Sequence, residues 1–147
     1  MDDSTANKVA LEVIQQYKEL SFNVCENNFI TPNENIQMRE VSLHPSVGRD
    51  RVFDFPKDLR ADIEFEHLAH LHFVESHLAE SGKPQWYCTS PYAAVYSGFF
   101  VAPKHVHIYV HDLLTPANGI EDAHEFYTRD LMESYLYYAS EIRRNHK

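Results

Sequence analysis

The chain has 147 residues, 44% of them hydrophobic and 13% aromatic, which is enough to build one globular domain, 1–147, around its own core. Its formal charge of −9 disfavours sequence-independent binding to nucleic acid, because an acidic protein repels phosphate backbones at long range. The apolar runs are too short to cross a membrane and the acidic N-terminus does not resemble a secretory signal, so we expect a cytoplasmic protein. With only Cys25 and Cys88, neither a disulfide scaffold nor a cysteine-based zinc site is favoured.

Residues 1–46 are predicted to form a helical and irregular N-terminal region. A helix is predicted over 4–20, because apolar residues recur there at helical spacing without glycine or proline. The stripe predicted to face the core comprises Ala6, Val9, Ala10, Val13, Tyr17 and Leu20. Residues 21–47 are compatible with a second short helix or an extended segment, with a turn at Thr31-Pro32-Asn33.

Residues 47–147 are predicted to form a sheet followed by a helix. The segment 47–50 is expected to be a loop that Phe53, Phe55 and Pro56 anchor to the body. Alternation of apolar and polar residues, or enrichment in β-branched and aromatic ones, predicts the strands 61–75, 85–89, 93–101 and 105–114. The connections are short, so neighbouring strands should be antiparallel, and Gly98 is a candidate bulge.

A long C-terminal helix is predicted over 120–145. Its apolar stripe at helical spacing comprises Ile120, Ala123, Tyr127, Leu131, Tyr135, Tyr138 and Ile142. Acidic residues lie in its first turn and basic residues near its end, which is the arrangement that the helix dipole favours. The predicted fold class is therefore α+β, an antiparallel sheet of four to five strands flanked by an N-terminal helix and a long C-terminal helix.

Histidines occupy alternate positions on two predicted strands. His70 and His72 share one strand face, and His105, His107 and His111 share a face of another. Arg49 and Asp50 lie just upstream of the first pair. Imidazoles titrate near neutral pH, so such a surface is suited to proton transfer.

A series of short motifs in order along the chain resembles the YafO toxin family of type II toxin-antitoxin systems. The motifs are Gly48-Arg49-Asp50, Phe53-Asp54, Ala69-His70-Leu71-His72, Thr89-Ser90, Val95-Tyr96, Pro116, Met132, Ala139 and Arg143-Arg144. The resemblance covers roughly 47–144. It implies a RelE-like endoribonuclease that cuts messenger RNA on the ribosome and is neutralised by a cognate antitoxin.

RNA cleavage without a metal or other cofactor needs a base, an acid and a cation at the scissile phosphate. His70 and His72 are the candidate base and acid, and Arg49 is the candidate phosphate clamp, since a guanidinium binds phosphate oxygens in bidentate fashion. Asp50 is expected to orient Arg49 or a histidine. The candidate RNA-binding residues are Arg51, Tyr87 and Tyr96, the two tyrosines as stacking surfaces.

Two other interpretations stay open. His70, His72, His105 and His107 form two His-x-His pairs, which are also suited to zinc or a similar ion. Alternatively, the chain is an acidic, non-enzymatic interaction or inhibitor protein, with the histidine face as its interface. A structural reading of Arg49 and Asp50 also stays open, in which the two residues form only a turn-stabilising ion pair.

Overall fold

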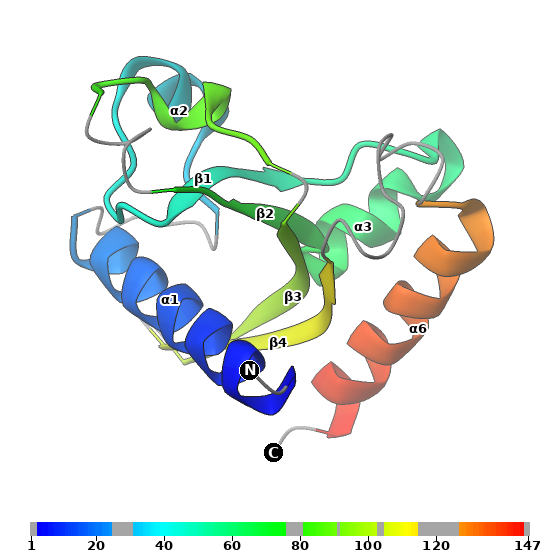
Figure 1. Cartoon of the computed structure of the whole chain (residues 1–147). Helices are drawn as coiled ribbons and strands as arrows, with labels where there is room; N and C mark the ends of the chain where they lie inside the picture. Colours follow the sequence, from blue (N-terminus) through cyan, green and yellow to red (C-terminus); the bar gives the residue numbers. More distant parts are fainter. Residues whose placement is uncertain are drawn as a thin grey trace. The chain divides into compact units, whose positions relative to one another are not determined.

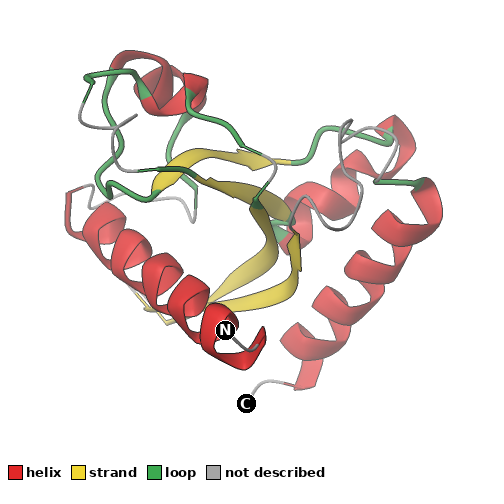
Figure 2. Cartoon of the chain, viewed as in Figure 1, coloured by secondary structure: helices red, strands yellow, loops and turns green. Residues whose placement is uncertain are grey.

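The computed structural model describes residues 3–24, 31–75, 81–90, 92–102, 105–114 and 127–145, and it has an α+β fold (Figure 1). The four described strands form one antiparallel sheet in the order β1-β2-β3-β4. They are β1 (Val47–Val52), β2 (Ala69–Phe73), β3 (Ala93–Ala102) and β4 (His105–Leu114). The α-helices are α1 (Asp3–Val24), α2 (Glu34–Arg39), α3 (Arg60–Glu66) and α6 (Arg129–Asn145). The predicted fold class is confirmed (Figure 2).

The chain divides into two compact units. The first contains residues 1–50 and 71–90, and the second contains residues 51–70 and 91–147. The strands β1 and β2 each contribute residues to both units. The organisation of 1–147 as a single domain stays a prediction. Across the described helices, none has both the length and the apolar character required to span a bilayer.

In the first unit, α1 confirms the helix predicted over 4–20 but buries a different face. The buried side chains, one helical turn apart along this face, are Ile14, Tyr17, Lys18 and Ser21. Val9 and Leu20, which the apolar stripe placed in the core, are 54% and 42% exposed. The stripe prediction is confirmed for Tyr17 and wrong for Val9 and Leu20. Two polar residues, Lys18 and Ser21, occupy the inward face, and a search for apolar periodicity does not detect them.

The segment after α1 contains the short helix α2, one of the two forms considered for 21–47. Asn33 caps it, because its side-chain oxygen accepts a hydrogen bond of 2.8 Å from the backbone N–H of Asn35. Asn33 therefore starts a helix rather than only a turn. Cys25 lies in 25–30, outside the described residues.

The loop predicted at 47–50 is instead the first part of strand β1. A Cβ atom on Gly48 would lie 2.0 Å from the carbonyl oxygen of Cys88. The glycine is therefore needed for the close approach of two backbone segments and not for a turn of the chain. The approach is held by a 2.8 Å hydrogen bond from the Arg49 N–H to that carbonyl.

The strand predicted at 85–89 is also wrong, since Gln85–Tyr87 form a 3-10 turn, η2. Gln85 anchors the turn from a buried position. Its Nε2 donates to the Gly48 carbonyl at 2.9 Å and to the Tyr17 hydroxyl at 2.8 Å. A buried amide with two partners explains why this segment packs without joining a ladder.

In the second unit, the first half of the strand predicted over 61–75 is the helix α3. Ile63 and Glu66, three residues apart, are buried, whereas Phe65 is 68% exposed. The alternation of Ile63 and Phe65 that favoured a strand was therefore misleading, because the buried face follows helical spacing. His67 ends the helix in the left-handed region at φ 52°, and β2 follows.

The strands predicted at 93–101 and 105–114 are confirmed as the antiparallel pair β3 and β4. Gly98 pairs regularly with Ile108, so the bulge predicted there is wrong. The register shifts instead between Val95 and Tyr96 and between Phe100 and Ala102.

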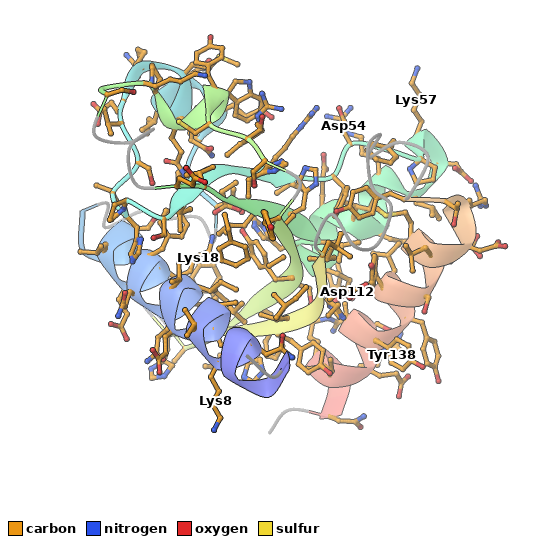
Figure 3. All side chains as sticks on the ribbon, in the orientation of Figure 1. Lys8, Lys18, Asp54, Lys57, Asp112 and Tyr138 are labelled. Carbon is orange, nitrogen blue, oxygen red and sulfur yellow. The ribbon has the colours of Figure 1, made fainter. Side chains whose placement is uncertain are left out.

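The helix α6 confirms the C-terminal helix from Arg129 onward. Tyr127 and Thr128, inside the predicted span, precede the helix, and the predicted start at 120 lies outside the described residues. Its buried residues are Met132, Tyr135, Leu136 and Ala139. Most of these join the core of the unit, which contains Phe53, Ile63, Leu68, Val95, Leu114, Tyr127, Met132, Tyr135 and Leu136. Tyr138, predicted to face that core, is 56% exposed and points outward (Figure 3).

We predict that Gly48→Ala destabilises the protein by about 2 to 4 kcal/mol, because the new methyl group must displace backbone atoms. The measurement is the free energy of unfolding in urea. Gly82→Ala is the matched control: nothing lies within 4 Å of its Cβ position, but its φ of +81° should still cost about 1 kcal/mol. Equal effects of the two changes would contradict the close approach at Gly48.

Candidate functional site

Arg49, the predicted phosphate clamp, lies half-buried on β1 in the first unit. Its Nε donates a 2.7 Å hydrogen bond to the backbone carbonyl of Trp86. Its guanidinium carbon lies 4.5 Å from the centroid of the Trp86 ring, within the range of a cation–π interaction. Two contacts to one residue therefore fix the guanidinium. No sequence pattern pointed to Trp86 in this role.

His72 lies on β2, and its ring is held by the backbone of Ser90. Nδ1 lies 2.8 Å from the Ser90 carbonyl oxygen and 3.3 Å from the Ser90 nitrogen. The shorter contact favours the tautomer in which Nδ1 carries the proton and donates to the carbonyl, and Nε2 then has the lone pair. The Ser90 hydroxyl in turn donates to the carbonyl of Phe73, which fixes Ser90.

Arg49 and His72 interact electrostatically. Burial lowers the pKa of His72, and the positive charge of Arg49 lowers it further, against the raising effects of the Ser90 backbone and Asp50. The imidazole is therefore neutral at pH 7 and able to accept a proton. The structure thus brings three of the four predicted catalytic residues, Arg49, Asp50 and His72, together in the first unit.

Asp50, in contrast, is fully buried. One carboxylate oxygen accepts hydrogen bonds from Lys18 Nζ at 2.6 Å and from the Tyr17 hydroxyl at 3.1 Å. The side chain of Gln37 bonds both backbone groups of Asp50, donating to its carbonyl at 2.8 Å and accepting from its N–H at 3.0 Å. Asp50 therefore fixes the strand that carries Arg49 and is not exposed to substrate.

Lys18 is the residue that sequence reasoning missed. It is 4% exposed and turns inward from α1, whereas Lys8 on the same helix points outward (Figure 3). Burial lowers the pKa of Lys18, and its contact with Asp50 opposes that shift. Burial also raises the pKa of Tyr17 well above its usual value, so its hydroxyl stays a proton donor to Asp50. A buried lysine requires such a partner, which lies 32 residues away in the chain.

The predicted RNA-binding residues differ in accessibility. Tyr87 is 51% exposed and follows Trp86 directly, as a stacking surface requires. Tyr96 is fully buried on β3, in ring contact with His67. Its prediction as a base-stacking residue was therefore wrong, because β3 is covered where Tyr96 lies. Arg51 is partly exposed and forms a 2.5 Å ion pair with Asp54.

The other candidate histidines, His70, His105, His107 and His111, belong to the second unit, and three of them have structural contacts. The His70 ring lies 4.4 Å from that of Phe53 and 5.7 Å from that of Tyr127, between centroids. His107 stacks on Phe99 at 5.1 Å. His111 shares a 2.8 Å hydrogen bond with the Ser97 hydroxyl, and burial lowers its pKa to about 4. His105 is exposed.

The alternative metal site is not formed. Within the described ranges, which include His70, His72, His105 and His107, no three histidine, cysteine or carboxylate side chains gather closely enough to hold a metal ion. Aromatic rings contact His70 and His107, and the Ser90 backbone holds His72, whereas His105 is exposed.

Comparison with known proteins gives one match. A family model described as "Toxin YafO, type II toxin-antitoxin system" matches residues 16–144. No curated protein and no solved structure matches the chain. The match begins upstream of the segment that carried the sequence resemblance, so it includes Tyr17, Lys18 and Gln37 with Arg49 and His72.

We predict that Lys18→Ala destabilises the protein by about 3 to 5 kcal/mol, because it leaves the Asp50 carboxylate buried without its cation. Lys8→Ala, at an exposed position of the same helix, should change stability by less than about 0.5 kcal/mol. Urea denaturation of both variants measures the difference. A Lys18 variant as stable as the parent would show that the ion pair does not hold β1 in place.

Proposed function

The chain belongs to the YafO toxin family of type II toxin-antitoxin systems, and we propose that it is a ribosome-associated endoribonuclease that cleaves messenger RNA by metal-independent acid/base chemistry. The observation that carries this proposal is the fixed guanidinium of Arg49 in electrostatic contact with a neutral His72. A toxin that arrests growth needs an essential target, and these two groups are suited to an RNA phosphate.

The chemistry assigns one task to each group. A base takes the proton of the ribose 2′-hydroxyl, the 2′-oxygen attacks the adjacent phosphorus, and the P–O5′ bond breaks. An acid returns a proton to the leaving 5′-oxygen, so the products are a 2′,3′-cyclic phosphate and a 5′-hydroxyl. The phosphorane-like transition state carries additional negative charge, which a positioned cation stabilises.

We assign the base to His72, since its lowered pKa leaves the imidazole neutral and the Ser90 carbonyl favours a lone pair on Nε2. Arg49 is the phosphate clamp, held by Trp86. For the acid we keep the candidate that the sequence suggests, His70, which belongs to the second unit. Asp50 acts from the interior by fixing the strand of Arg49. Tyr87 and Arg51 are the proposed contacts to the flanking RNA.

The acidic body is compatible with this activity if the ribosome presents the RNA. Long-range electrostatic attraction matters most when a protein has to capture free nucleic acid, and the formal net charge of −9 disfavours that capture. On a ribosome the messenger is already held close, so local groups such as Arg49 decide the reaction. The proposed location is accordingly the cytoplasm, with the ribosome, messenger RNA and a cognate antitoxin as partners.

Substitution of the site residues should abolish cleavage without unfolding the chain. We expect Arg49→Ala and His72→Ala each to lower cleavage of messenger RNA on translating ribosomes by about two to four orders of magnitude, the usual effect of losing charge stabilisation or a general base. The assay maps cut sites and growth arrest after induction, with melting temperature measured in parallel. His70→Ala tests the assignment of the acid.

The matched control is His105→Ala, an exposed histidine outside the proposed site, which should leave cleavage within about threefold of the parent. Normal cleavage by folded Arg49 and His72 variants would refute the site. A parent protein that neither cuts RNA nor arrests growth would favour the acidic interaction protein.

Cleavage should also survive removal of divalent ions from the toxin. Because Arg49 and the histidines supply the charge and the protons, toxin dialysed against a chelator and returned to ribosomes in their normal magnesium buffer should retain full activity. Loss of cleavage that zinc or manganese restores would refute the metal-independent mechanism.

A further inference from the structure

The residues that line a groove of about 490 Å³ come from α3, the turn before it and α6 in the second unit. The helices α3 and α6 contact each other and lie side by side in Figure 1. Its lining includes Asp62, Phe65, Glu66, Tyr137, Arg143 and Arg144. None of the residues assigned to RNA cleavage lines it. The groove therefore needs a separate explanation.

Large aromatic rings flank the groove from both helices. Phe65 on α3 is 68% exposed and Tyr137 on α6 is 60% exposed. Aromatic side chains that stay in water on a folded surface and border a concave region are typical anchors of protein interfaces. The groove thus offers apolar contact on both sides.

The centre of the groove is already ordered. Arg143 forms three hydrogen bonds with the carboxylate of Glu66, at 3.1, 3.1 and 2.9 Å, and Glu66 is only 7% exposed. The Arg143 guanidinium also lies 4.7 Å from the centroid of the Phe65 ring. A bidentate pair that also holds an aromatic ring lowers the entropy lost when a partner binds.

The charged side chains that line the groove indicate which side chains a partner must carry. Two of the three carboxylates that line the groove already have a cation, since Glu66 is paired with Arg143 and Glu133 with Arg129. Asp62 and Arg144 have no ion pair among the described residues, so a partner with one basic and one acidic side chain complements the groove.

We propose that this groove binds an amphipathic helix of the cognate antitoxin. Membership of a toxin-antitoxin family supplies the partner protein, and the acidic chain favours a partner with basic residues. A third helix lying across α3 and α6 inserts an apolar anchor between Phe65 and Tyr137. It places a basic residue at Asp62 and an acidic residue at Arg144. The inference concerns binding and does not depend on the nuclease assignment.

The test measures binding of the purified, full-length chain to the purified product of the adjacent gene by isothermal titration calorimetry. Phe65→Ala combined with Tyr137→Ala should raise the dissociation constant by about 100-fold or more, as loss of aromatic anchors does. Arg144→Glu should raise it by about tenfold. Both changes are at exposed positions, and circular dichroism verifies that the variants fold.

Tyr138→Ala is a stringent control, because Tyr138 is 56% exposed and adjacent to Tyr137 but does not line the groove. Its dissociation constant should stay within about threefold of the parent value. The proposal is overturned if the double variant binds like the parent, if Tyr138→Ala is equally damaging, or if the parent does not bind the adjacent product. Light scattering that shows a dimer of the parent and a monomer of the double variant would instead assign the groove to self-association.

Discussion

The buried ion pair between Lys18 and Asp50 is the constraint on which the first unit depends. Two charges taken out of water are costly unless each has a close partner and further hydrogen bonds, and here the 2.6 Å contact is supplemented by Tyr17 and Gln37. Because these bonds end on one residue of β1, they determine where the strand lies relative to α1. Arg49 is the adjacent residue on this strand, so the same bonds fix the position of its backbone.

A second constraint acts on the same strand from the segment 85–90. Gly48 lets the Cys88 carbonyl approach β1, and Gln85 bonds both Gly48 and Tyr17. The segment thereby places Trp86 against Arg49 and Ser90 against His72. Two polar side chains that start on different strands are thus positioned by one short stretch of chain, which explains how Arg49 and His72 are held in fixed geometry.

Sequence reasoning succeeded where periodicity was strong and failed where a single contact decided the structure. The helix α1 and the strands β3 and β4 follow from residue patterns longer than two turns or four alternations. Gly48 suggested a loop, because a sequence does not distinguish a glycine that turns from one that permits close approach. The burial of Asp50 depends on Lys18, 32 residues away, so no local pattern predicts it. Likewise the apolar residues of 61–66 alternate as in a strand, whereas the helix buries Ile63 together with Glu66, whose partner Arg143 lies far along the chain.

Trp86 is the only tryptophan of the chain, and its ring lies against the Arg49 guanidinium. Indole emission responds to nearby charge and to the polarity of its surroundings, whereas the nine tyrosines emit at shorter wavelength. The protein therefore carries an intrinsic fluorophore at the residue on which the proposed chemistry depends. Its spectrum reports the state of that guanidinium without any label, in the free chain and in its complexes.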